Sequence, residues 1–166
     1  MKVKEQFNIG DKAVYPGHGV GEIIAIEIKK IGNQELSFYI MKILDSDLKI
    51  MIPTNNVKST GVRDLIKKDK IPKVYEILKE QDIKIDNVAW NKRFKDYNEK
   101  LKSGSIYEIA EVLRDLYVLK KTKELSFGEK RMYEMAINFI SQEISIVKST
   151  EREEIIEEIE AILQEG

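Results

Sequence analysis

The sequence has 166 residues, of which 42% are hydrophobic and 34% are charged, and its formal net charge is −1. This composition is typical of a folded, highly charged protein and excludes an intrinsically disordered chain. The chain has no cysteine, which excludes disulfides, a thiol nucleophile and cysteine-based zinc sites. No apolar run approaches the roughly 18 residues that a membrane helix needs, and the segment from Met1 to Glu5 lacks the apolar core of a signal peptide. We therefore expect a soluble, cytoplasmic protein without membrane attachment.

The N-terminal third of the chain shows the pattern of short β-strands separated by tight turns. The expected strands are Lys12–Tyr15, Val20–Ile31, Glu35–Leu44 and Leu48–Ile52. The expected turns are Pro16-Gly17-His18-Gly19 and Gly32-Asn33-Gln34, and Pro53 ends the last strand. Alternation in that last strand directs Lys49 and Met51 outward, where Met51 either belongs to a docking face or covers a second apolar layer. This pattern predicts a small barrel of the SH3 or Tudor type.

From Gly61 onward, the apolar residues recur with the period of helices. We expect helices over Ile71–Lys79 and Val88–Lys102, and three more marked by the apolar stripes Ile106–Tyr117, Tyr133–Val147 and Ile155–Leu163. Capping boxes are expected at Ser105-x-x-Glu108, Ser126-x-x-Glu129 and Thr150-x-x-Glu153. The predicted fold class is therefore α+β with two domains. A β-barrel spans residues 1–60, and an all-α bundle of about five helices spans residues 61–166.

Residues for catalysis or metal binding are difficult to find. The single histidine, His18, lies between glycines and has no second histidine or cysteine to complete a metal site. The glycine-rich segment Tyr15–Gly21 lacks the Gly-Lys-Ser/Thr ending of a phosphate loop and precedes a strand. Turn conformations with positive φ explain these glycines better. We expect no enzyme activity, no catalytic residue, no metal and no cofactor.

The charge is distributed unevenly along the chain. Residues 90–131 contain 11 Lys/Arg against 7 Asp/Glu, a local charge of +4, whereas residues 143–166 contain 2 against 8, a local charge of −6. A neutral protein of this kind can present one positive face to nucleic acid. On charge alone, ordinary solvated helix faces are the favoured explanation, because such asymmetry is common.

A set of segments in a fixed order resembles one protein family over nearly the whole chain. These segments are Phe7–Gly21, Pro53 with Gly61–Asp64, Trp90–Lys95, Ala110–Leu116 and Leu125–Met132. In this order they resemble the CarD/CdnL family of bacterial transcription-initiation factors. The N-terminal part is also similar to the polymerase-interacting domain of the transcription-repair coupling factor.

The resemblance implies two binding functions. The N-terminal domain would dock on the β1 lobe of the bacterial RNA polymerase β subunit through the positions of Lys29, Ile31 and Met51. Relatives carry arginine where this chain has Met51, so docking is expected to be weakened or altered there. The helical domain would contact promoter DNA at the upstream edge of the melted bubble and stabilise the open complex, and Lys130 matches a DNA-contacting position in relatives.

The segment around Trp90 allows two interpretations from its residues. The indole can wedge against an unstacked base while Lys92, Arg93 and Lys95 neutralise phosphates. Alternatively, Trp90 begins a helical core stripe that continues through Phe94, Tyr97 and Leu101. The residues alone favour the core stripe, since aromatics at helical spacing are usually buried. The family resemblance instead implies a partly packed Trp90 at the exposed start of its helix, which we favour.

Basic residues also flank the turn between the two expected helices marked by Ile106–Tyr117 and Tyr133–Val147. The basic residues are Lys120, Lys121, Lys123, Lys130 and Arg131, of which Lys130 and Arg131 are the expected DNA contacts. Alternatively, these residues belong to an ordinary solvated connection between two helices, in which the helix dipole favours Lys120 to Lys123 near a helix C-terminus. No element resembles a major-groove reader, so binding to DNA should be non-sequence-specific. We expect a monomer that associates with the nucleoid through polymerase; the alternative function is a polymerase-binding adaptor without DNA contact.

Overall fold

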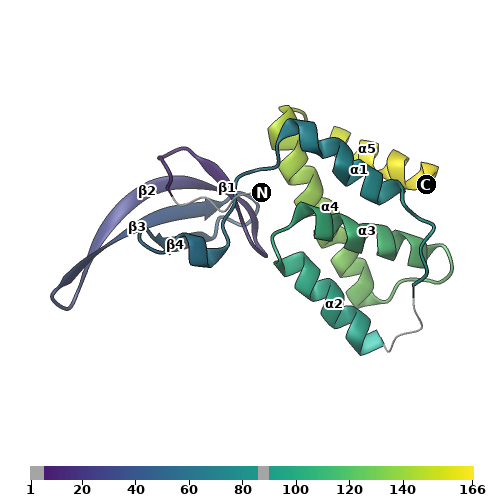
Figure 1. Ribbon diagram of the computed structural model, residues 1–166, viewed down its shortest axis with the longest axis horizontal. Coiled ribbons are helices and arrows are strands. Elements are labelled where there is room, and N and C mark those ends of the chain that lie inside the picture. The colour runs from purple at the N-terminus through teal and green to yellow at the C-terminus, as the bar shows by residue number, and fades with distance from the viewer. Residues whose placement is uncertain (1–5, 86–89) are drawn as a thin grey trace. The chain divides into compact units, whose positions relative to one another are not determined.

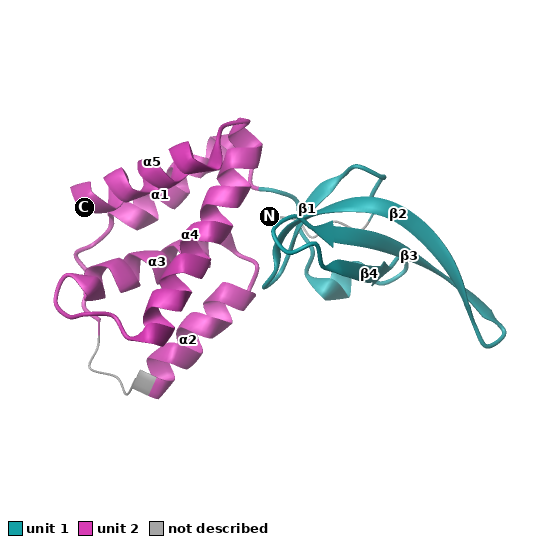
Figure 2. Ribbon diagram, turned by 180° about the vertical axis from the view of Figure 1, so that it is seen from behind, with its two compact units in different colours: residues 1–65 teal, residues 66–166 magenta. Residues whose placement is uncertain are grey.

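The computed structural model describes residues 6–85 and 90–166, apart from the side chain of Trp90. The chain forms two compact units, residues 1–65 and residues 66–166 (Figure 2). The first unit is a β-sheet and the second is helical, which confirms the predicted two-domain α+β class.

The first unit is built on a four-stranded antiparallel sheet. Its strands are β1 (Lys12–Tyr15), β2 (Gly19–Ile31), β3 (Gln34–Ile43) and β4 (Lys49–Pro53), in the order β1-β2-β3-β4 (Figure 1). All four predicted strands are present, with ends shifted by at most one residue. The hairpin turn is shorter than predicted because Gln34 pairs with Ile31, which leaves Gly32 and Asn33 to make the turn. Gly17 and Gly19 have the positive φ expected of turn glycines, 80° and 91°.

The segment after β4 completes this unit. Val57 and Val62 are buried in the sheet's core, beside the 3₁₀ helix η1 (Lys58–Thr60). Arg63 forms an antiparallel bridge with Val14 of β1, in which each backbone N–H donates to the other's carbonyl at 3.1 and 2.8 Å. The segment after β4 thus reaches β1 at the opposite edge of the sheet. Because these contacts hold residues 61–65 to the sheet, the first unit extends a few residues beyond the sequence-based boundary near Gly61.

The described residues of the second unit begin with the 3₁₀ helix η2 (Lys68–Lys70) and form five α-helices. They are α1 (Ile71–Lys79), α2 (Trp90–Lys102), α3 (Ile106–Lys120), α4 (Phe127–Lys148) and α5 (Arg152–Glu165). The long helix α4 packs against α2, α3 and α5, and α1 packs against α3 and α5 (Figure 1). Leu113, Leu116, Ile140 and Ile144 are fully buried among these helices. In the part of the chain that the structure describes, no helix combines the length and apolarity that spanning a membrane requires.

The three predicted helix caps have different outcomes. Ser126 and Glu129 form the complete capping box of α4, as predicted. Ser105 accepts a hydrogen bond from the Glu108 N–H at the start of α3. The prediction for Thr150 is wrong, because α5 begins after Glu151 without a side-chain cap. Thr150 belongs instead to the turn that ends α4, where its hydroxyl donates to the Lys148 carbonyl.

Candidate functional site

The three residues predicted to dock on polymerase lie on one face of the sheet. Strand pairing aligns Ala25 of β2, Ile40 of β3 and Met51 of β4, and directly paired residues project to the same side. Lys29 and Ile31 follow Ala25 at even spacings on β2, so they project to that side as well. We call this surface, made by Ala25, Lys29, Ile31, Ile40 and Met51, the sheet face.

The sheet face is accessible and partly apolar. Met51 is 41% exposed and Ile31 is 58% exposed, whereas Ile40 between β2 and β4 is buried. Met51 stands on β4, an edge strand of the sheet, and both interpretations of Met51, as part of a docking face or as a cover over an apolar layer, stay predictions. An edge strand can accept a further strand through its backbone groups, and the exposed apolar side chains beside it supply contact area.

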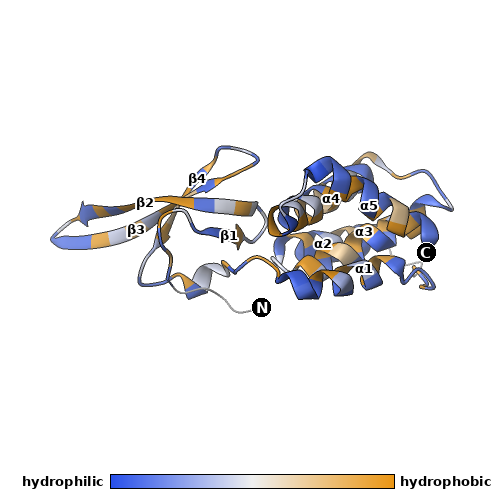
Figure 3. Cartoon of the chain, turned by 90° about the horizontal axis from the view of Figure 1, so that it is seen from above, coloured by the Kyte–Doolittle hydropathy of each residue, from blue (hydrophilic) through white to orange (hydrophobic). Residues whose placement is uncertain are grey.

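Sequence reasoning missed a second exposed surface on the same hairpin. Ile26 and Ile28 are 47% and 70% exposed, and they project from the side of the sheet opposite Lys29 and Ile31. The outer part of the hairpin formed by β2 and β3 therefore carries exposed hydrophobic residues among hydrophilic ones (Figure 3). The unbroken run Ile23-Ile24-Ala25-Ile26 was the available signal, because it departs from the alternation of a strand with one solvated face.

In the helical unit, α2 has apolar side chains on a buried face and two of its lysines on an exposed face, as its periodicity predicts. Tyr97 and Leu101 are buried, and Phe94 is partly buried against the same core. Lys92 and Lys95 are exposed and available to solvent or to an anion. Trp90 is the first residue of α2, and its side chain lies outside the described residues, so its role as wedge or core residue stays a prediction.

Arg93 differs from its two basic neighbours because it is tied to a buried carboxylate. Its guanidinium lies 3.4 Å from Glu129 of α4, and only 17% of its side chain is exposed. Glu129 also accepts from the Ser126 backbone N–H and from Lys123, both at 2.9 Å. Arg93 therefore joins α2 to the start of α4. This structural contact was not predicted from the sequence, which suggested only that Arg93 neutralises phosphate.

The environment of Glu129 favours its ionised form. Burial by itself would raise the pKa of this carboxyl, but hydrogen bonds from the Ser126 backbone, from Lys123 and from the Ser126 side chain outweigh burial and lower the pKa. A carboxylate kept charged at this position holds three segments together: α2, the connection before α4, and the first turn of α4.

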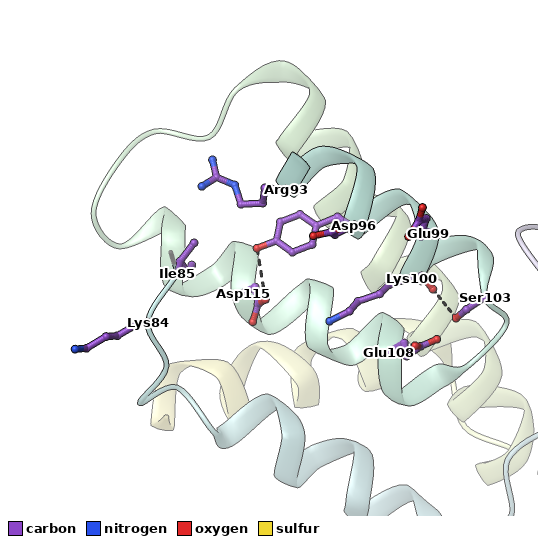
Figure 4. A pocket seen from close by; sticks show the side chains of 10 residues that line it. Lys84, Ile85, Arg93, Asp96, Glu99, Lys100, Ser103, Glu108 and Asp115 are labelled. Atoms are coloured by element: carbon purple, nitrogen blue, oxygen red, sulfur yellow. Dashed lines mark hydrogen bonds between the residues drawn. The ribbon is translucent and has the colours of Figure 1, made fainter. Parts of the chain in front are cut away.

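A cavity of about 430 Å³ lies beside this junction, along α2 and α3 (Figure 4). Its lining mixes charges of both signs, and Tyr97 donates a hydrogen bond of 3.4 Å to Asp115 inside it. Burial raises the pKa of Asp115, although Arg114 and Lys100 act in the opposite direction. Among the described residues, no three His, Asp or Glu side chains are grouped to hold a metal ion. His18 is exposed in the turn between β1 and β2, where its ring lies beside the ring of Tyr15.

The connection between α3 and α4 presents the remaining predicted contacts. Lys130 and Arg131 are both exposed, and Lys130 approaches Glu124 at 3.5 Å. A second cavity, of about 590 Å³, is lined there by Lys120, Lys121, Thr122, Lys123, Glu124, Leu125, Lys130, Tyr133 and Glu134. Phe127, which sequence reasoning did not single out, is 84% exposed at the start of α4. These features distinguish a β unit with an edge strand and exposed apolar side chains from a helical unit with several exposed cations between α3 and α4.

Comparisons with known proteins agree with this division. Residues 7–66 match the family model of the CarD-like/TRCF RID domain, and residues 73–160 match that of the CarD C-terminal domain. The chain is 34% identical over 152 residues to the putative transcription factor YdeB of Bacillus subtilis (strain 168), covering 90% of this chain and 97% of that protein.

Two solved structures from Myxococcus xanthus are similar to the N-terminal part of the chain. CdnLNt is 46% identical and covers 41% of this chain and 96% of its own, with a TM-score of 0.33. The 72-residue N-terminal domain of CarD is 36% identical and covers 36% of this chain and 79% of its own, with a TM-score of 0.31.

The chain belongs to the CarD/CdnL family, because the two family models and the relative together span nearly all of it. Membership makes it an RNA polymerase-interacting transcription regulator and not an enzyme. The family thus assigns interaction with RNA polymerase to the β unit in general, while the individual contact residues stay predictions.

Proposed function

We propose that this protein docks on the β1 lobe of the RNA polymerase β subunit and stabilises the open promoter complex in the bacterial cytoplasm. The observation that carries the docking proposal is the common orientation of Lys29, Ile31 and Met51 on the sheet face. A cation, two exposed apolar side chains and an edge strand together suit a partner strand flanked by apolar and acidic groups. The family resemblance implies an arginine at this position in relatives, so Met51 would make this docking surface more apolar than theirs.

The helical unit provides the proposed DNA contacts. Lys92 and Lys95 on α2 and Lys130 and Arg131 on α4 are exposed cations suited to phosphates. Arg93 contributes mainly by joining α2 to α4 through Glu129, which supports the position of the helix that begins with Trp90. We propose that Trp90 packs against the upstream edge of the melted bubble, where the cost of unstacking is already met by polymerase.

The effect on transcription follows from a difference in affinity between two states of the promoter. A factor that binds the open complex more tightly than the closed complex shifts their ratio by that difference, and about 1.4 kcal/mol corresponds to tenfold. One aromatic contact contributes about 1–3 kcal/mol, a range that includes this value. Docking by the β unit raises the local concentration of the helical unit, so weak affinity for DNA alone is expected.

The test is the lifetime of the open complex on one promoter with purified polymerase, measured after a competitor challenge. We expect the full chain to lengthen this lifetime, Trp90→Ala to remove most of the effect, and Trp90→Phe to retain part of it. Binding of each variant to polymerase and its urea unfolding serve as controls. An unchanged lifetime with wild-type protein at saturating docking would refute the proposal.

The adaptor function without DNA contact has one observation in its favour. Several cations of the helical unit already have acidic partners, namely Arg93 and Lys123 with Glu129, and Lys130 with Glu124. A hydroxyl-radical footprint of the promoter complex separates the two functions. Additional protection upstream of the bubble that disappears in a Lys92→Glu/Lys95→Glu variant supports DNA contact, whereas an unchanged footprint with bound protein supports the adaptor.

A further inference from the structure

Phe127 is an exposed aromatic residue without an assigned role. At 84% exposure, it is the most exposed large hydrophobic side chain in the described part of the chain. It is the first residue of α4, and it is not among the described residues that pack on the helical core. Leaving an aromatic ring in water forfeits the free energy of its burial, which a ligand that covers the ring would recover.

The backbone beneath Phe127 is held firmly. Ser126 and Glu129 form the complete capping box, Glu129 is buried, and Leu125 and Met132 are buried on either side. A ligand that covers the ring would therefore need to immobilise only the two side-chain torsions of the phenylalanine. Such preorganisation lowers the entropic cost of binding.

Two cations accompany the ring along the exposed face of α4. Lys130 and Arg131 follow Phe127 by three and four residues, the spacings at which side chains of a helix are neighbours. Side chains of a helix lean toward its N-terminus, which directs both cations toward the ring. Lys130 is 56% exposed, and its partner Glu124 is 88% exposed, so this surface ion pair is weak and can be exchanged for a phosphate.

The surroundings extend this cationic surface to the connection before α4. Lys120, Lys121 and Lys123 line the cavity that also contains Lys130, and Lys120 lies 5.5 Å from the ring centre of Tyr133. Between Lys120 and Glu134 there are five cations and three carboxylates. A ligand that combines a flat apolar face with closely spaced negative charges matches an exposed ring bordered by cations.

We propose that Phe127 is a second aromatic contact to nucleic acid, stacking on an unpaired base while Lys130 and Arg131 bind the adjoining phosphates. Every base offers a π-face, and a phenylalanine ring carries no hydrogen-bonding group, so the contact is independent of sequence. This inference rests on the proposed function and adds a second contact to it, on a different helix from Trp90. A protein partner of the same surface is the competing occupant.

The test uses the full chain with polymerase and promoter DNA, together with a forked oligonucleotide duplex. Phe127→Ala should weaken binding to the fork by about fivefold or more, the lower limit for base–aromatic stacking of about 1–3 kcal/mol, and shorten the open-complex lifetime. Phe127→Tyr should retain both activities, and Phe127→Leu should behave like Phe127→Ala despite its apolar bulk. Asn138→Ala, another exposed residue of α4, is the matched control.

Replacement of Phe127 by the photoreactive p-benzoylphenylalanine identifies what covers the ring. A crosslink to promoter DNA supports the inference, while a crosslink confined to a polymerase subunit, or none, overturns it. Equal lifetimes for Phe127→Ala and wild type, with a shorter lifetime for Trp90→Ala, would overturn the inference and leave the proposed function intact. If the wild type does not lengthen the lifetime, the proposed function fails, and the crosslink alone decides whether Phe127 contacts DNA.

Discussion

Replacing Glu129 with alanine should destabilise the helical unit strongly. The Glu129 carboxylate accepts the Ser126 N–H at 2.9 Å and contacts Lys123 and Arg93, while its side chain is 2% exposed. Loss of the Glu129 half of the capping box, the hydrogen bond from the Ser126 N–H, costs about 1 kcal/mol. Leaving a buried charge unpaired costs about 3–5 kcal/mol, which must be reduced here because Arg93 keeps some exposure. Lys123, at 42% exposure, adds less than about 1 kcal/mol.

Together these effects predict a loss of about 2–4 kcal/mol in the free energy of unfolding, which we would measure by urea denaturation followed by helical circular dichroism. Glu129→Gln should lose roughly half as much, because the amide oxygen still accepts from Ser126. Glu134→Ala on the exposed face of α4 should change stability by less than about 0.5 kcal/mol. A change in Glu129→Ala no larger than that of Glu134→Ala would refute the reasoning.

The contribution of Glu129 should also depend on pH. Its pKa in the folded protein lies below the ordinary value of 4.5, so folding favours the ionised form. The stabilisation is therefore fully present above about pH 4.5 and is lost as the pH falls through the lowered folded-state pKa. The stability difference between wild type and Glu129→Gln should shrink on acidification. A difference that stays constant down to pH 3 would show that the carboxylate's charge is not what matters.

Two further predictions concern the site residues. Met51→Arg should strengthen docking on polymerase by about tenfold, because a cation on the sheet face gains about 1.4 kcal/mol from one acidic partner. Biolayer interferometry with immobilised polymerase measures this affinity. Unchanged or weaker binding would contradict the prediction. Asp115→Asn should become more stable relative to wild type as the pH rises above 3.8, because burial raises the pKa of Asp115 and makes its ionisation costly in the folded state. Urea unfolding at pH 3 and pH 6 tests this, and a relative loss of stability at pH 6 would contradict it.

The sequence by itself determined the order and type of nearly every element. Alternation and β-branched residues located the four strands, and the helical period with capping residues located the helices, because these signals arise from neighbours along the chain. The α1 bounds, Ile71–Lys79, and the capping box at Ser126 were predicted correctly for this reason. Thr150 was predicted incorrectly because its hydroxyl has two possible local partners, and the turn that ends α4 decides between them.

Contacts between distant residues were decided only by the tertiary structure. The register of three strands places Lys29, Ile31 and Met51 on one face, although more than 20 residues separate Met51 from Lys29 in sequence. Arg93 and Glu129, which pair across α2 and α4, are 36 residues apart in the sequence. The helical period places Arg93 beside the apolar stripe of α2, but no local pattern names Glu129 as its partner. Exposure of Phe127 likewise depends on how α4 packs against its neighbours. Side-chain burial and ion pairing depend on the whole fold, whereas helix and strand signals are local.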